Sequence, residues 1–176
     1  MEGQNVLVVV DAYSKWIETR LMKNISAGST VRAMRNMFSC YGIQDTVVSD
    51  NGTNFISQEF FQFLSENGVE HVQTAPKHPS SNGLAERAVQ TVKHGIKKLL
   101  GGDIQTKLDK FLLRYRVTPQ ATTGKTPSEL FLKCVLRTRL DKIRPNLSQW
   151  VRAKQARMAD QGSHKIRHVC WRGSAG

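Results

Sequence analysis

The sequence has few of the features that stabilise small secreted domains or anchor a chain in a membrane. Its three cysteines are odd in number and form no C-x-x-C pair, so neither a disulfide framework nor a zinc ribbon is indicated. The longest aliphatic run, residues 6–10, is far too short to cross a bilayer. The first five residues lack the basic start and apolar core of a signal peptide. We therefore expect a nuclear or cytoplasmic protein with no membrane partner.

Acidic residues are scarce in the second half of the sequence but not in the first. Residues 1–86 contain 6 Lys and Arg against 9 Asp and Glu, whereas residues 87–176 contain 20 against 5. This asymmetry predicts a polyanionic partner for the second half. A basic face that is merely solvated is the alternative. With 176 residues, the chain is long enough for one domain with a sizeable core.

The hydrophobic pattern alternates between strands and helices and predicts an α/β fold. Two early strands joined by a short link indicate an antiparallel hairpin, and the stretch 75–82 is expected to be a Pro/Ser-rich loop. The expected strands are 5–12, 16–22, 46–50 and 69–74, and the expected helices are 26–41, 57–67, 83–100, 103–116, a short one beginning at Thr126, and 148–160.

Two carboxylates stand at predicted ends of elements. Asp50 ends a β-branched strand and precedes the turn signal Asn51-Gly52, so it is expected at the carboxyl end of that strand. Glu86 follows the helix-start signal of residues 80–83 and is expected in the first turn of a long helix. Carboxylates placed in this way can converge on a hard cation such as Mg²⁺.

The long helix also presents a mixed polar face. Glu86, Gln90, Lys93 and Lys97 follow one another at helical spacing, beside an apolar stripe. A metal ligand followed by groups suited to phosphate is one interpretation. The other is an ordinary solvated face with lysines at the end that the helix dipole favours. The expected stripe consists of Ala85, Val89, Val92, Ile96 and Leu99.

Two motifs carry a family resemblance. The segments VVSDNGTNF around Asp50 and HPSSNGLAER around Glu86, with 35 residues between the two acids, closely resemble the catalytic core of retroviral and long-terminal-repeat retrotransposon (gypsy-like) integrases. These are DDE-type polynucleotidyl transferases with a ribonuclease-H-like mixed sheet flanked by helices. The resemblance covers roughly residues 4–146, and RYRVTPQATTGKTPSELFLK is similar to the segment that follows the core in this group.

The resemblance implies DNA integration by metal-dependent strand transfer, with Mg²⁺ or Mn²⁺ as the cofactor. Asp50 and Glu86 would be the catalytic, metal-binding residues. The implied partners are the retroelement ends, the target DNA and further copies of the chain. The implied DNA-binding residues are Asn82, Arg87, Gln90, Lys93 and Lys97.

The sequence departs from the family at the first of its three carboxylates. VVVDAYSKW matches the family's second strand, so Asp11 corresponds to a position outside the triad, and the first catalytic Asp would fall before Met1. We expect the sheet to lack its first, central strand, which would expose two inner edges or force them to pair. A site with two carboxylates should also be severely impaired in two-metal phosphoryl transfer.

Three regions and three functions follow from these observations. We expect a partial catalytic core at 1–100, a helical continuation at 101–146 and a basic, poorly ordered tail at 147–176. In the tail, His164, His168 and Cys170 lack a fourth ligand for zinc, and His78 is expected to be a hydrogen-bonding loop residue. The chain is a strand-transfer enzyme, a non-catalytic DNA-binding or interaction module, or a non-functional retroelement fragment.

Overall fold

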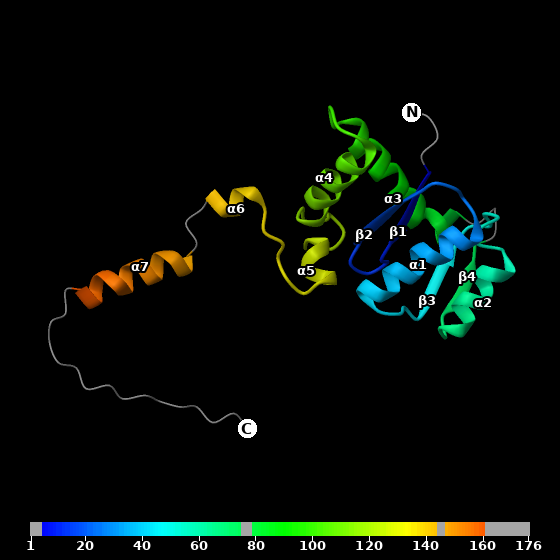
Figure 1. Cartoon of the computed structure of the whole chain (residues 1–176), viewed down its shortest axis with the longest axis horizontal. Coiled ribbons are helices and arrows are strands. Elements are labelled where there is room, and N and C mark those ends of the chain that lie inside the picture. Colours follow the sequence, from blue (N-terminus) through cyan, green and yellow to red (C-terminus); the bar gives the residue numbers. More distant parts are fainter. Residues whose placement is uncertain (1–4, 75–78, 144–146, 161–176) are drawn as a thin grey trace, which may run out of the picture. The chain divides into compact units, whose positions relative to one another are not determined.

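The computed structural model describes residues 5–74, 79–143 and 147–160 (Figure 1). It divides the chain into two units, Met1–Leu136 and Arg137–Gly176, which are described separately below. No helix in the described ranges has the length and hydropathy needed to cross a bilayer.

The first two strands form the predicted antiparallel hairpin. β1 (Asn5–Val10) pairs with β2 (Ile17–Met22), in a register that runs from Asn5 opposite Met22 to Val10 opposite Ile17. The turn between them is closed by the Asp11 carboxylate, which accepts hydrogen bonds from the Ser14 backbone N–H (2.7 Å) and the Ser14 hydroxyl (2.5 Å). Asp11 therefore serves the local turn.

The other two strands are parallel and are connected by a helix. β3 (Thr46–Ser49) pairs with β4 (Glu70–Gln73), and α2 (Gln58–Glu66) connects them. The ladder continues for one residue beyond β4, because the Thr74 N–H donates to the Ser49 carbonyl at 3.0 Å. A parallel pair needs a crossover of this kind, and a helix is the usual one.

Within the described residues the four strands form two separate two-stranded sheets, β1–β2 and β3–β4. The bond from the Asp11 N–H to the Trp16 carbonyl fixes the alternation in the hairpin, so the backbone groups of the even-numbered residues of β1 point away from β2. By the same reasoning, Thr46 and Val48 point away from β4. In the described ranges no strand lies between the two pairs, and the two inner edges do not pair with each other.

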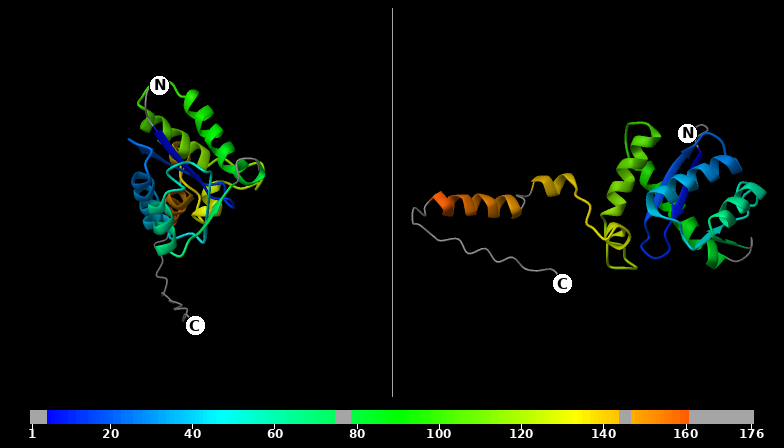
Figure 2. Two further views of the ribbon diagram at one scale, coloured as in Figure 1. Left: turned by 90° about the vertical axis from the view of Figure 1, so that its right-hand side faces the viewer. Right: turned by 60° about the horizontal axis from the view of Figure 1, so that its bottom comes forward.

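Helices cover both faces of the strands (Figures 1 and 2), and an apolar cluster lies on each face. The first joins α1 (Ala27–Tyr41) and α2 to Leu7, Val9 and Val47; the second joins α3 (Pro79–Lys97) and α4 (Ile104–Arg116) to the even-numbered residues of β1. β1 is covered on both faces, which explains its unbroken apolar sequence. The buried members are Val31, Met34, Met37, Phe60, Phe63, Leu64 and Val69 in the first cluster, and Ile17, Ala88, Val92, Ile96, Leu108 and Leu112 in the second.

Local signals in the sequence place most helix ends correctly. Ser26 caps α1, and Gly42 ends it with a positive φ of 86°, a conformation that suits glycine. Ser57 caps α2 without a capping box, as predicted. Asp103 caps α4, and Thr126 forms the predicted capping box with Glu129 at the start of α5 (Pro127–Phe131).

Two predictions about elements are wrong. Residues 79–82 were expected to be loop but form the first turn of α3, because proline at the first position of a helix has no N–H to leave unpaired. Glu86 therefore lies about two turns inside the helix, and α3 ends at Lys97 instead of Leu100. On α2, Phe60, Phe63 and Leu64 are buried, whereas Phe61 is 36% exposed.

The second unit contains α6 (Arg139–Ile143) and α7 (Leu147–Asp160), and α7 confirms the helix predicted at 148–160. His78 and the group His164, His168 and Cys170 lie outside the described residues. The region boundaries proposed at residues 100 and 146 stay predictions.

Candidate functional site

Asp50 lies directly after β3, in a turn that fixes one of its oxygens. The Gly52 N–H donates to Asp50 Oδ1 at 3.0 Å, and no hydrogen bond to Oδ2 is found in the described part of the chain. A Cβ on Gly52 would lie 3.0 Å from both Asp50 Oδ1 and Asn54 Oδ1, a close approach that favours glycine at this position. Asn54 is buried and donates to Thr30 Oγ1 at 3.1 Å, which ties the turn to α1. Asp50 is thus an anchored carboxylate with one solvent-facing oxygen.

The residue before Asp50 is held by two groups from the end of β4. The Thr74 hydroxyl donates to the Ser49 carbonyl at 3.2 Å, in addition to the Thr74 backbone bond. The Ser49 hydroxyl lies 3.0 Å from the Asp50 carbonyl oxygen and 2.9 Å from His71 Nε2. The His71 ring packs edge-on against Phe60, and burial lowers the pKa of His71 below its ordinary value. This group of contacts was not predicted from the sequence, where a histidine inside a short strand is the only feature that points to it.

The polar face of α3 is turned to solvent. Glu86, Gln90, Lys93 and Lys97 are all exposed, as predicted from their spacing. The opposite face is buried at Ala88, Val92 and Ile96, whereas the predicted stripe residues Ala85, Val89 and Leu99 are only half-buried. Arg87 is exposed and donates from Nε to the Gly83 carbonyl at 3.3 Å. The side chain of Asn82 lies outside the described part.

In the described structure the two predicted carboxylates share no hydrogen-bond partner. Among the described residues Glu86 has no hydrogen-bond or ion-pair partner, and no group of three or more His, Cys, Asp or Glu side chains is placed to hold a metal ion. The structure therefore presents two separately supported, solvent-facing carboxylates.

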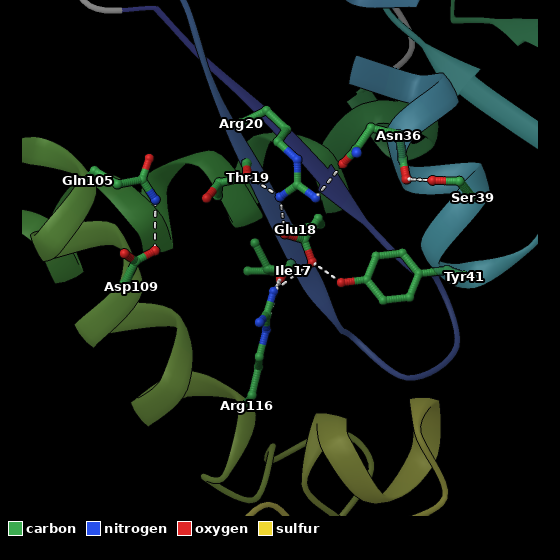
Figure 3. A network of polar contacts seen from close by, with 10 residues as sticks. All are labelled: Ile17, Glu18, Thr19, Arg20, Asn36, Ser39, Tyr41, Gln105, Asp109 and Arg116. Atoms are coloured by element: carbon green, nitrogen blue, oxygen red, sulfur yellow. Dashed lines mark hydrogen bonds and ion pairs between the residues drawn. The ribbon is translucent and has the colours of Figure 1, made fainter. Parts of the chain in front are cut away.

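A buried polar network elsewhere in the first unit was not foreseen. Glu18 on β2 is 7% exposed and pairs with Arg20 at 2.6 Å and with Arg116 at 2.7 Å, and it accepts a hydrogen bond from the Tyr41 hydroxyl at 2.7 Å (Figure 3). Burial raises the pKa of Glu18, but the Tyr41 hydrogen bond and the two guanidinium charges outweigh it, so the net shift is downward. Burial and the neighbouring Glu18 raise the pKa of Tyr41 to about 12.

The network joins three elements of the fold. Arg116 on α4 donates to the Ile17 carbonyl at 2.9 Å and stacks over the Trp16 ring at 4.0 Å, and Trp16 in turn stacks on Phe131 of α5. A cavity of about 220 Å³ opens beside it, between β2 and α4, lined by Arg20, Gln105, Asp109 and their neighbours. The lining of this cavity includes neither Asp50 nor Glu86. The network around Glu18 therefore connects β2, α1 and α4 and lies apart from the two predicted carboxylates; we call it the joint around Glu18.

Comparison with known sequences identifies the domain. Residues 2–79 match the sequence model of the family described as Integrase core domain. An uncharacterized protein of Caenorhabditis elegans is 42% identical over 148 residues, which cover 82% of this chain and 12% of that protein. The Gag-Pol polyprotein of Walleye dermal sarcoma virus is 30% identical over 141 residues, which cover 75% of this chain and 8% of the polyprotein. The chain thus spans a small fraction of the length of these relatives.

Solved structures confirm the fold. A chain of the simian T-cell lymphotropic virus intasome, solved with the PP2A regulatory subunit B56 gamma, superposes with a TM-score of 0.68 at 20% identity, covering 77% of this chain and 52% of that chain. The catalytic core of BIV integrase gives 0.65 at 20% identity, covering 75% and 88%. The HTLV-2 integrase core, solved with magnesium in a trimeric form, gives 0.60 at 21% identity, covering 73% and 93%. Residues 2–79 thus match the Integrase core domain, and the fold is that of retroviral integrase catalytic cores.

Proposed function

We propose that this chain binds DNA along the exposed polar face of α3. The observation that carries the proposal is the placement of Gln90, Lys93 and Lys97 on one solvent-facing side of a helix whose other side is buried. Neither lysine has an ion-pair partner among the described residues, so both ammonium groups are available to phosphates. Arg87 and Asn82 belong to the same proposed surface by their position in α3.

The charge of the second half supports the proposal. Residues 87–176 contain 20 Lys and Arg against 5 Asp and Glu. This excess of positive charge attracts a polyanion that comes within about one Debye length of the surface. In the second unit, α7 adds exposed cationic side chains at Arg152 and Arg157. Residues 151–158 of α7 are exposed, and an exposed basic surface suits a phosphate backbone better than an apolar partner.

We further propose that Asp50 and Glu86 are metal ligands. Integrase cores generally depend on divalent metal ions, and one solved relative contains magnesium. The donor chemistry fits: two solvent-facing carboxylates are hard oxygen ligands of the kind that Mg²⁺ and Mn²⁺ prefer. A bound ion would polarise a phosphate oxygen as a Lewis acid. In this chain Asp50 would be held for that role by the Gly52 N–H, and Glu86 by α3.

DNA binding, without strand transfer, is the function proposed for these 176 residues alone. The described residues supply two carboxylates and no third that completes a cluster, and a site with two carboxylates holds a metal pair weakly. Metal-dependent strand transfer is the second candidate, and the match to the Integrase core domain together with the exposed carboxylates favours it.

Removing the two lysines tests the DNA proposal. The double variant K93Q/K97Q should bind a DNA duplex more weakly, with a salt dependence of the affinity whose slope falls by about two, because two phosphate contacts are lost. Fluorescence anisotropy across a salt series measures both quantities. The matched control K23Q/K125Q removes the same charge from exposed residues outside α3. Equal losses in both double variants would refute a specific role for α3.

Asp50→Asn separates binding from metal chemistry. The substitution removes one repelling charge, so DNA affinity should stay unchanged or rise, while Mn²⁺ binding and any metal-dependent activity should be lost. Broadening of nearby backbone resonances by Mn²⁺ measures the ion, with Asp45→Asn as the control at an exposed acid at the opposite end of β3. Weaker DNA binding by D50N, or unchanged Mn²⁺ broadening, would contradict the assignment of Asp50.

A further inference from the structure

We propose that His71 is a positioning residue for Asp50, acting through the hydroxyl group of Ser49. The contact chain runs from His71 Nε2 to Ser49 Oγ at 2.9 Å, and from Ser49 Oγ to the Asp50 carbonyl oxygen at 3.0 Å. The inference rests on the proposed function only in treating Asp50 as the metal-binding carboxylate.

The direction of the hydrogen bonds follows from the single proton of a hydroxyl group. Ser49 donates that proton to the Asp50 carbonyl, so its oxygen must accept the N–H of His71 Nε2. His71 is then neutral, with its proton on Nε2 and a lone pair on Nδ1. That Nδ1 is buried and has no hydrogen-bond partner in the described structure. A second proton there would bury a charge and a donor without an acceptor.

The Ser49 hydroxyl binds the Asp50 carbonyl, a group that makes no hydrogen bond within the β3–β4 pair. The Thr74 N–H bonds to the Ser49 carbonyl, so alternation turns the Asp50 carbonyl away from β4, toward the open edge of β3. In the described residues the Ser49 hydroxyl is the group that binds it. Asp50 is thus restrained at three places: the preceding carbonyl by Thr74, its own carbonyl by Ser49, and its carboxylate by Gly52.

The His71 ring is itself fixed by α2. It packs against Phe60 at 5.3 Å and Phe61 at 5.0 Å between ring centroids. The second contact gives the partly exposed Phe61 side chain a packing partner. The ring therefore transmits the position of α2 to the end of β3. Groups that orient a metal ligand in this indirect way typically change metal affinity by 10- to 100-fold when removed (an order-of-magnitude range).

Three variants separate positioning from plain stability. His71→Leu removes the donor and keeps apolar volume against the phenylalanines, whereas His71→Gln keeps an N–H that can reach Ser49. Val47 lies opposite His71 in the register of β3 and β4, so Val47→Ala removes packing volume beside the ring without removing either hydrogen-bonding group of the contact chain. It is therefore the control for lost packing alone. If H71L does not fold, Ser49→Ala replaces it as the test variant. It removes the hydroxyl group that links His71 to the Asp50 carbonyl and leaves the His71 ring in place.

The deciding measurements use the full chain without metal. Long-range ¹H–¹⁵N correlation should show His71 protonated on Nε2. Hydrogen exchange of the Gly52 amide, corrected for global stability, should be about tenfold faster in H71L than in V47A and should return toward wild type in H71Q. A proton on Nδ1, or equal Gly52 exchange in H71L and V47A, would overturn the proposal. A Mn²⁺ titration of the wild type is scored separately, because its failure would count against the metal site and not against the contact chain.

Discussion

Charged side chains in this molecule divide into those that join elements and those that face solvent. Glu18 has a shifted pKa and three partners, yet its partners come from β2, α1 and α4 and fill the joint between them. Asp50 and Glu86 are exposed, and these are the positions that the family motifs mark. A perturbed pKa indicates a functional site only when the group is also accessible. In this chain Glu18, the buried carboxylate with a shifted pKa, is structural, and Asp103 and Glu129 have lowered pKa values because they accept hydrogen bonds at helix starts. The candidates are the exposed carboxylates Asp50 and Glu86.

Removing the Glu18 carboxylate should destabilise the first unit strongly. In Glu18→Ala the Arg116 side chain, 17% exposed, would stay buried without its counter-charge, at a cost of about 3 kcal/mol in the free energy of unfolding. Urea denaturation measures this value. Glu66→Ala, at an exposed acid on α2, is the control and should change stability by less than about 0.5 kcal/mol. A loss in E18A no larger than that of E66A would show that the network contributes little.

His71 should make stability depend on pH in a window of its own. Burial lowers its pKa below 6.5, so the unfolded chain binds a proton that the folded chain does not as the pH falls below 6.5. The free energy of unfolding should therefore decrease in that direction, before Glu18 and the other carboxylates with lowered pKa titrate below 4.5. Its described neighbours Ser49, Phe60 and Phe61 are not ionisable. In H71Q the decrease between these two pH values should be smaller, as urea melts at stepped pH would show; an unchanged slope would assign it to other groups.

At the scale of elements, caps were predictable and contacts between helices were not. Ser26, Ser57, Asp103 and Thr126 stand where the sequence placed them, because a cap depends on residues only two or three positions away. The burial of Ala88 depends on what packs against α3, and α4 follows only after a further connecting segment of the chain. The apolar periodicity of α3 predicts which face of the helix is buried, but it does not predict which residue lies at the centre of that face.

Gly95 should be required by the packing of α3 on α4. A Cβ at this position would lie well inside the van der Waals distance of the Phe111 ring. Alanine favours a helix by about 1 kcal/mol over glycine, but overpacking costs about 1–3 kcal/mol, so Gly95→Ala should be destabilising by about 1 kcal/mol. Gly83→Ala is the control on the same helix, where the nearest atom, Arg87 Nη2, is 3.9 Å away, and it should be neutral or stabilising. Thermal unfolding of both variants tests this; a gain of stability in both would contradict it.

At the scale of the whole molecule, the fold class and the residues of the two motifs could be predicted from the sequence, but the contacts that support these residues could not. The motif spacing placed Asp50 and Glu86 on the correct elements, since each lies beside its own turn or helix signal. The joint around Glu18 and the contact chain from His71 link residues 98 and 22 positions apart, respectively. Periodicity reports only local neighbours, so contacts of this kind become visible only in the folded chain.

The two open strand edges should govern how the whole chain behaves in solution. The outward backbone groups of β3 and of β1 can pair with another chain, and Val48, 49% exposed, adds an apolar side chain to the edge. Val48→Lys should therefore lower concentration-dependent self-association, because a charged side chain on an edge disfavours pairing. Ile43→Lys makes the same change of charge at a residue that is 56% exposed and lies outside the strands. Sedimentation velocity over a concentration series should show V48K more monomeric than both I43K and wild type. A wild type that stays monomeric throughout, or an equal effect of the two lysines, would show that the edges do not drive association.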